Sequence, residues 1–274
     1  MEYIQAIVLG IVQGLTEFIP ISSSAHLVVV RELFGWDNPG VFFDAILHLG
    51  TALAVIFAFW RTWWELILSV GDMFRTRKIF DTFEKKMVWF LIIGTIPALL
   101  IGYFLEDFFE QFFTSLFWVG IFLIITGVIF HLVEFVRRNN MNKTLKKMKW
   151  WQAGLIGLVQ ALALFPGVSR SGITMMTGMS LGFKRSSAAR FSFMLSLPVI
   201  LLAGSYGIYE FATETVSGTS EFGIISVIIG FIVSAVIGFL AINAFIRFVK
   251  RNSLTVFASY MLLLGVILLV VNFI

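Results

Sequence analysis

Cysteine is absent from the 274-residue chain, which excludes disulfide bonds and thiolate metal sites and leaves the redox environment undetermined. Charged residues are also scarce, at 13%, whereas soluble domains carry about 25%. Hydrophobic residues make up 59% of the chain. This composition excludes a water-soluble protein and predicts a polytopic integral membrane protein, surrounded by membrane lipids, with a single membrane domain over residues 1–274.

A basic leader segment is missing too, because the chain begins Met1-Glu2-Tyr3, and we expect no cleaved signal peptide. Basic loops of a membrane protein explain the formal net charge of +4, which therefore gives no support to nucleic acid as a partner. By contrast, the 31 phenylalanines and 8 tryptophans suit lipid-facing surfaces and interfacial belts.

Basic and acidic residues occupy different segments. Lys and Arg gather in residues 61–86, 137–149, 184–190 and 247–251, which the positive-inside rule places in the cytoplasm. Two segments without Lys or Arg are then external, and their acidic residues are Glu106, Asp107 and Glu110 in one and Glu210, Glu214 and Glu221 in the other. Six spans are predicted between these segments: Phe42–Trp60, Met87–Tyr103, Leu116–Val136, Phe191–Tyr209, Gly223–Ile246 and Leu254–Ile274.

The apolar segment Trp150–Phe183 does not fit this alternation, since basic clusters flank it on both sides. It must enter from the cytoplasm and return there, either as a re-entrant hairpin or as two crossings. Its middle, residues 165–172 (FPGVSRSG), is a poor helix and a good turn, which favours the hairpin.

A similar stretch opens the chain, 147 positions earlier. Among residues 10–24, seven are identical at this offset: Gly10, Val12, Gln13, Leu15, Phe18, Ser22 and Ser24 match Gly157, Val159, Gln160, Leu162, Phe165, Ser169 and Ser171. We interpret this as an internal repeat, with repeat one at 1–149 and repeat two at 150–274.

Loop charge predicts that the two repeats have inverted topology. The span after the first hairpin ends in a basic loop, and the span after the second ends in an acidic one. The fold class is therefore all-α, with six transmembrane helices plus two re-entrant helical hairpins whose polar tips meet near the midplane, where helix N-termini can hold an anion. Both termini are expected outside.

The first tip carries a carboxylate, hydroxyls and an imidazole. Gln13 and Glu17 are four residues apart, so they share a helix face and could jointly hold a hard cation or a polar ligand. Ser22 and Ser23 precede His26 by four and three residues, so one helical turn would bring a hydroxyl to the imidazole. Such a pair can activate a serine nucleophile.

The second tip carries Ser169, Arg170, Ser171 and Thr174. An arginine at membrane depth requires an anionic partner, and its planar fork suits phosphate. Together the two tips supply a nucleophile, a base, a carboxylate and a guanidinium, a set suited to phosphoryl transfer.

Structural roles compete with these interpretations. Hydroxyls in membrane helices usually stabilise packing, and Glu17 and Arg170 could form only a buried salt bridge. Asp44 and His48, four residues apart, either extend the site or satisfy each other, and the sequence leaves both open.

The motifs resemble one known family over the whole chain. Gln13 and Glu17 are similar to its (Glu/Gln)-x-x-x-Glu motif, residues 18–26 (FIPISSSAH) to its serine–histidine stretch, and residues 166–174 (PGVSRSGIT) to its PGxSRSxxT motif. The chain resembles the bacterial undecaprenyl-diphosphatases of the bacitracin-resistance type. It departs from them mildly, with glutamine at position 13 and alanine at position 25.

The resemblance implies a multi-pass plasma-membrane enzyme that hydrolyses undecaprenyl diphosphate to undecaprenyl phosphate. This activity recycles the carrier lipid for peptidoglycan synthesis and confers bacitracin resistance. The resemblance also implies a site open to the external side and a divalent cation, Mg²⁺ or Ca²⁺. The oligomeric state stays open, a dimer included.

The resemblance further implies roles for single residues. Glu17 is the essential carboxylate and a candidate cation ligand, Ser23 the nucleophile and His26 its catalytic partner. The expected substrate-binding residues are Arg170, Ser169, Ser171, Thr174, Ser22 and Gln13. In this hypothesis Ser23 or a positioned water attacks the terminal phosphorus and His26 takes the proton. The alternative is a polyprenyl-phosphate flippase or transporter, because inverted repeats are typical of transporters.

Overall fold

A computed structural model describes residues 1–113, 115–137, 140–214 and 222–273, and in these ranges the fold is helical, with one isolated β-bridge between Lys143 and Phe183. The predicted repeat one (1–149) contains α1 (Glu2–Thr16), α2 (Ser23–Phe34), α3 (Val41–Ala58), α4 (Trp60–Thr76), α5 (Phe83–Phe113) and α6 (Leu116–Arg137). The predicted repeat two (150–274) contains α7 (Trp150–Gln160), α8 (Arg170–Ser180), α9 (Arg185–Glu214), α10 (Ile224–Val249) and α11 (Thr255–Phe273). Two 3₁₀ turns, Leu145–Lys147 and Ala161–Leu164, flank α7. The predicted all-α class is confirmed.

Six described helices are long and apolar enough to cross a membrane, as the sequence predicts. They contain the stretches Val41–Ala58, Phe83–Leu105, Leu116–Arg137, Arg185–Tyr209, Ile224–Val249 and Thr255–Asn272. One difference concerns the basic segment 61–86, which is not simply a loop, because α4 occupies most of it. Trp60, Trp64, Ile67 and Leu68 recur on one side of α4 and are exposed there, the pattern of an amphipathic helix.

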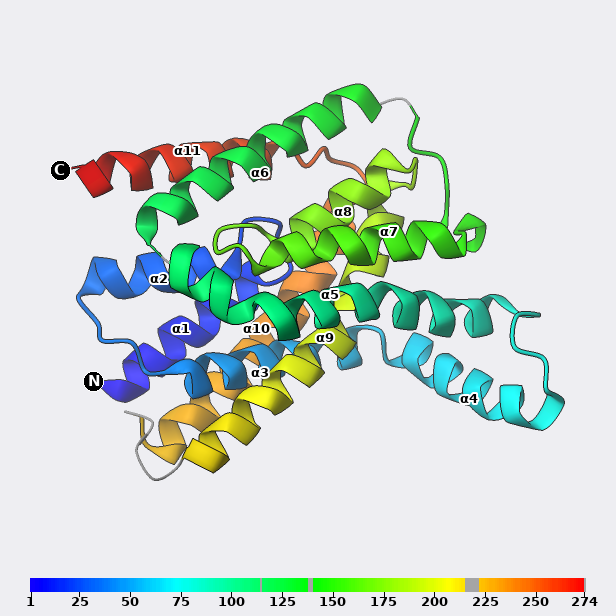
Figure 1. Ribbon diagram of the computed structural model, residues 1–274, viewed down its shortest axis with the longest axis horizontal. Coiled ribbons are helices and arrows are strands. Elements are labelled where there is room, and N and C mark those ends of the chain that lie inside the picture. The colour runs from blue at the N-terminus through cyan, green and yellow to red at the C-terminus, as the bar shows by residue number, and fades with distance from the viewer. Residues whose placement is uncertain (114, 138–139, 215–221, 274) are drawn as a thin grey trace.

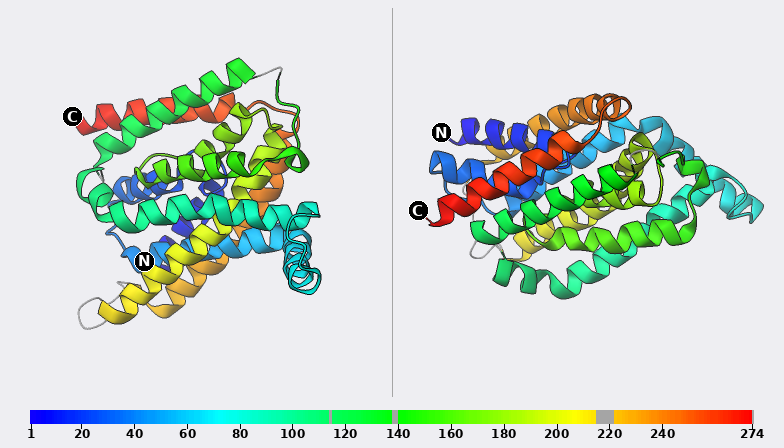
Figure 2. Two further views of the ribbon diagram at one scale, coloured as in Figure 1. Left: turned by 45° about the vertical axis from the view of Figure 1, so that its right-hand side comes forward. Right: turned by 90° about the horizontal axis from the view of Figure 1, so that it is seen from above.

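The helices run roughly alongside one another, and the connections gather at two ends (Figure 1). One end holds both chain termini and the α2–α3 and α5–α6 connections, and the other holds α4 and the segments before α7 and α11. Figure 2 shows the same separation, with α4 projecting from the bundle. The side chains of Glu106, Asp107, Glu110, Glu210, Glu214 and Glu221 lie outside the described residues, so the external placement of the first end stays a prediction.

The two hairpins enter the bundle from opposite ends (Figure 1). α1 starts at the end of the termini and α2 returns there, whereas α7 and α8 start and finish at the opposite end. This arrangement is compatible with two re-entrant hairpins of inverted orientation. Their relation to a bilayer stays a prediction.

The turns of both hairpins have the same local structure. Ser22 and Ser169 are the N-cap residues of α2 and α8, and each side chain accepts a hydrogen bond from the backbone N–H three residues later, at 3.4 Å and 3.1 Å. Each cap hydroxyl also lies 3.2 Å from the hydroxyl two residues on, Ser24 or Ser171. A serine at an N-cap satisfies an otherwise unpaired N–H, so both caps fix where the half-helices begin.

The first helix of each predicted repeat packs against a helix of the other repeat. α1 packs on α10 and α7 packs on α5, which are equivalent pairs in the two predicted repeats. Equivalent glycines make both contacts. A Cβ at Gly10 would lie 3.0 Å from the Gly230 carbonyl oxygen, and a Cβ at Gly157 would overlap the Gly94 carbonyl. Small residues let membrane helices approach closely. The pattern is what two related halves would give.

We predict that Gly157→Ala destabilises the protein more than Gly10→Ala does, because its new methyl group meets backbone with no room to move. Thermal unfolding in detergent measures the difference. Gly71→Ala is the control: nothing lies within 4 Å of a Cβ at this α4 position, and the greater helix propensity of alanine should leave the melting temperature equal or higher. Equal losses at all three positions would contradict the close approach of α5 and α7.

Candidate active site

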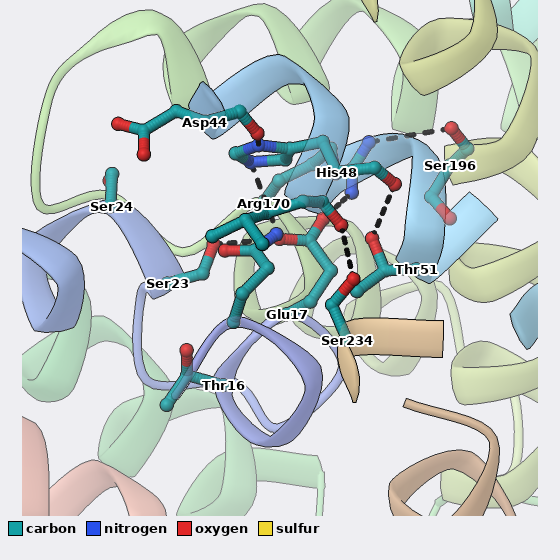
Figure 3. Close-up of polar contacts among 12 residues, drawn as sticks. Thr16, Glu17, Ser23, Ser24, Asp44, His48, Thr51, Arg170, Ser196 and Ser234 are labelled. Carbon is teal, nitrogen blue, oxygen red and sulfur yellow. Dashed lines mark hydrogen bonds and ion pairs between the residues drawn. The ribbon is translucent and has the colours of Figure 1, made fainter. Parts of the chain in front are cut away.

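Both hairpin tips converge on the carboxylate of Glu17, which follows α1 directly and is 6% exposed (Figure 3). Oε1 accepts a hydrogen bond from Nη2 of Arg170 and forms an ion pair with it. Oε2 accepts hydrogen bonds from the Ser23 hydroxyl at 2.7 Å and from Nε2 of Gln13 at 2.9 Å. Ser171 adds a further link between the tips, since its hydroxyl donates to the Ile19 carbonyl at 3.4 Å.

Ser23 and Arg170 occupy equivalent positions in the two hairpins. Ser23 is the first residue of α2 and Arg170 the first of α8, and they lie 147 positions apart. The matching caps at Ser22 and Ser169 therefore direct both residues inward from the ends of their helices. Because helix N-termini attract negative charge, the carboxylate lies where an anion is best stabilised.

The site opens into a cavity of about 400 Å³. Its polar wall comes from both tips and from α3: Glu17, Ser22, Ser23, Ser24, Asp44, His48, Gln160, Ser169 and Arg170. Its other walls are largely apolar and include Ala161, Ala163, Leu164, Val199, Ile200 and Ala203. A polar end joined to an apolar surface suits an amphiphilic ligand with a charged head.

In the structure the Ser23 hydroxyl donates to Glu17 and the His26 nitrogens bond other groups, so the hydrogen bond expected between Ser23 and His26 is not formed, and a catalytic role of His26 stays a prediction. Nδ1 of His26 lies 2.7 Å from the Ser22 carbonyl oxygen, which can only accept, so Nδ1 donates. Nε2 lies 2.7 Å from the Tyr260 hydroxyl, and the two rings stack. Both imidazole nitrogens are therefore occupied away from the site. The Ser23 hydroxyl bonds the ionised carboxylate instead, a stronger acceptor than an imidazole nitrogen.

His48 reaches the carboxylate from α3. Its Nδ1 donates to the Asp44 carbonyl oxygen at 2.8 Å, which directs Nε2 toward Oε2 of Glu17 at 3.7 Å. The Asp44 carboxylate forms an ion pair with Arg31 of α2, and Arg31 also donates to Asn38 at 3.1 Å. The question that the sequence left open is answered: both Asp44 and His48 line the cavity, and Asp44 also ties the first hairpin to α3.

The structure divides the expected binding residues. Ser169 and Arg170 line the cavity, as does Ser22 of the first tip. Ser171 and Thr174 do not, although both were expected to bind substrate. Thr174 is 1% exposed, donates to the Arg170 carbonyl at 2.8 Å and lies 2.6 Å from the Ser192 hydroxyl, so it fixes α8 against α9. A threonine inside a helix commonly bonds the carbonyl four residues earlier, which explains its direction.

Few side chains around Glu17 could act as ligands of a divalent cation. The described residues contain no group of three His, Asp or Glu side chains that could hold a metal ion. Glu17 is already bonded to Arg170, Ser23 and Gln13, but Oε1 of Gln13 is buried and has no partner among the described residues. Gln13 does not line the cavity and turns its Nε2 toward Glu17, so of this pair the Glu17 carboxylate is the group that could contact Mg²⁺, which keeps several waters and is often held largely by substrate phosphates.

The structure gives three further residues a place in or beside the site, and Tyr260 is the one that the sequence did not indicate. His48 and Tyr260 belong to distant helices, and no local spacing relates them to Glu17 or His26. Gln160 was visible in the sequence as the repeat partner of Gln13, and the structure places it on the cavity wall.

We predict that Arg170→Met lowers the free energy of unfolding by about 3–5 kcal/mol, because it leaves the Glu17 carboxylate buried without its cation. The double variant Glu17→Gln/Arg170→Met should regain most of this loss, since no charge is then left unpaired. Unfolding in detergent compares the two variants. A double variant no more stable than Arg170→Met would show that the pair is not energetically coupled.

Comparisons with known proteins show the family to which the chain belongs. A family model described as "Bacitracin resistance protein BacA" matches residues 6–267. The undecaprenyl-diphosphatase of Desulforudis audaxviator is 43% identical over 271 residues, covering 99% of this chain and 98% of its own length. The undecaprenyl-diphosphatase of Caldicellulosiruptor bescii is 42% identical over 270 residues, covering 98% and 97%. With matches along nearly its whole length, the chain belongs to the BacA family of bacitracin resistance proteins.

Proposed function

We propose that this protein removes the terminal phosphate from undecaprenyl diphosphate. The observation that carries the proposal is the convergence of the Ser23 hydroxyl and the Arg170 guanidinium on one buried carboxylate beside a cavity. Relatives covering nearly the whole chain are undecaprenyl-diphosphatases. The product, undecaprenyl phosphate, is the carrier form that peptidoglycan synthesis uses, and removal of the diphosphate form explains bacitracin resistance.

Ser23 supplies the nucleophile in this mechanism. Its hydroxyl donates to Glu17 at 2.7 Å, so the carboxylate can take the proton as the oxygen attacks the terminal phosphorus. A bond forms between Oγ and phosphorus while the bond to the bridging oxygen breaks, and undecaprenyl phosphate leaves. Water then hydrolyses the phosphoserine and releases phosphate. Direct attack by water is the alternative, with Glu17 as its base.

Arg170 neutralises the charge that develops on the transferred phosphoryl group. A guanidinium has five N–H donors, and among the described residues Arg170 makes two hydrogen bonds, one to Glu17 and one to the Ser196 carbonyl at 3.4 Å. The remaining donors can bind phosphate oxygens without release of Glu17. Ser22 and Ser169 lie at the same wall and can complete the cradle.

A divalent cation would be held by Glu17 and by the diphosphate itself. When bound, it would neutralise diphosphate charge and so favour departure of the lipid phosphate. The role proposed for His26 differs from the expected one. Its hydrogen bonds to Ser22 and Tyr260 support a part in positioning α2 against α11 rather than in proton transfer.

The six apolar helices indicate a membrane protein, and we assign it to the bacterial plasma membrane. Support for an external opening comes from the cavity, which extends past Tyr206 and Gly207 of α9 and Val41 at the start of α3. α3 begins, and α9 ends, toward the end of the bundle that holds both termini (Figure 1). The apolar cavity walls can contact the first isoprene units while the rest of the tail stays in lipid. The comparisons do not favour the flippase alternative.

We predict that Ser23→Ala and Glu17→Gln each reduce phosphate release from undecaprenyl diphosphate by about 10³-fold or more, and that Arg170→Ala reduces it by about 10²–10³-fold. His26→Asn should cost less than about tenfold, since His26 does not contact the reacting groups. Phosphate release in detergent, with folding checked by gel filtration, provides the measurement. A loss of activity in His26→Asn as large as that in Ser23→Ala would support the hypothesis that His26 is the catalytic partner of Ser23.

We predict that Gln13→Glu lowers the Mg²⁺ concentration needed for half-maximal activity, because a second carboxylate beside Glu17 strengthens a hard-cation site. The change should also increase the rise in melting temperature that Mg²⁺ produces. Gln152→Glu is the matched control: Gln152 is equally buried but bonds the Lys149 backbone N–H, away from the site, so the Mg²⁺ dependence should not change. A Gln13→Glu protein with unchanged Mg²⁺ dependence would show that charge at position 13 does not affect the cation site.

A further inference from the structure

Gln160 is a buried amide that nothing in the mechanism above uses. It is the last residue of α7 and is 2% exposed. Neither Nε2 nor Oε1 has a hydrogen-bond partner in the described part of the chain. The same residue lines the cavity together with Ser169 and Arg170. An amide therefore stands, unsatisfied, at the wall of the site.

Burial without partners is unfavourable for an amide. Each unsatisfied buried donor or acceptor costs about 1–3 kcal/mol, so an apolar side chain of the same size would suit the unliganded protein better. The other two buried glutamines of the described chain each bond to the protein: Gln13 donates to Glu17 through Nε2, although its Oε1 has no partner, and Gln152 accepts from the Lys149 N–H at 3.0 Å. Of these three buried glutamines, Gln160 is the one in which neither amide atom has a partner, and it lines the cavity.

Comparison of the two hairpins explains why this amide is free. Gln13 and Gln160 are equivalent, 147 positions apart. Gln13 holds the carboxylate of Glu17, four residues later. The residue four positions after Gln160 is Leu164, which has no polar group to hold. The second hairpin thus keeps the glutamine but lacks its partner, and the amide is available to an external ligand.

We propose that Gln160 binds the diphosphate of the substrate, with its Nε2 donating to a phosphate oxygen. This inference rests on the proposed function. Phosphate oxygens accept hydrogen bonds, and an amide nitrogen offers two N–H donors without adding charge. The isoprenoid tail cannot serve as the partner, because alkyl groups would leave the amide as unsatisfied as before. Ser169 and Arg170 place the other donors of the second tip at the same wall.

The test is Gln160→Met, which keeps the length of the side chain and removes both polar atoms. We expect the KM for undecaprenyl diphosphate to rise about 5- to 20-fold, the loss of one hydrogen bond to a charged group. The melting temperature without substrate should stay equal or rise, since no bond inside the protein is lost. The increase in melting temperature on adding undecaprenyl diphosphate should shrink. Gln160→Glu, which puts a negative charge against the phosphate, should raise the KM further.

Gln152→Met is the matched control, because it removes a buried amide that does have a protein partner. It should lower the melting temperature and leave the KM unchanged. An unchanged KM in Gln160→Met, or a melting temperature that falls as in Gln152→Met, would overturn the proposal and make the amide structural. Failure of the wild-type protein to release phosphate would instead refute the proposed function, so the two failures are distinguishable.

Discussion

The ionised side chain of Glu17 sets the main constraint on this structure. A carboxylate that is 6% exposed is tolerated only when charge and hydrogen-bond donors surround it. Those donors come from two places far apart in the sequence: Gln13 and Ser23 belong to the first hairpin, and Arg170 belongs to the second. Neither hairpin can satisfy the carboxylate alone. The site therefore forms only when the two halves of the chain dock.

The packing of the bundle serves this docking. Gly10 and Gly157 let α1 and α7 approach their partner helices closely, and each glycine lies on the helix that leads into a tip. The serine caps then set the start of each half-helix, so that its first residue faces inward. Small errors in either element would displace Ser23 or Arg170 from the carboxylate. The long apolar helices provide the scaffold, and a few small residues determine the position of the tips.

Equivalent positions in the two hairpins have taken different chemistry. The serine caps and their serine–serine contacts match in the two hairpins. At other equivalent positions the residues differ: Ser23 corresponds to Arg170, and Glu17 corresponds to Leu164. One hairpin thus holds the nucleophile and its carboxylate, and the other holds the guanidinium. This division matches what phosphoryl transfer requires, since the attacking group and the charge-stabilising group must approach one phosphorus atom from different sides. A symmetric pair of tips could not supply both.

The sequence predicts where the helices lie better than it predicts which side chains contact one another in the site. Loop charge and apolar length are enough to find six spans, and the shared Gln and Ser residues identify the two tips, because these properties are local. The structure does not form the expected hydrogen bond between Ser23 and His26, because helical spacing shows only that two groups are near each other, not which acceptor a hydroxyl selects. Glu17 is the stronger acceptor, and Tyr260, 234 positions from His26, offers the imidazole another partner. Such long-range competition has no signature in local spacing, and the same is true of His48.

The central claim is that both tips act on one diphosphate. An experimental structure of the Ser23→Ala protein with undecaprenyl diphosphate and Mg²⁺ tests it most directly, since the variant should bind the substrate without hydrolysing it. The account predicts that the terminal phosphate lies within about 3 Å of the Arg170 guanidinium and next to residue 23, inside the cavity beside Glu17. A diphosphate bound elsewhere, for example among the lysines between α6 and α7, would contradict it.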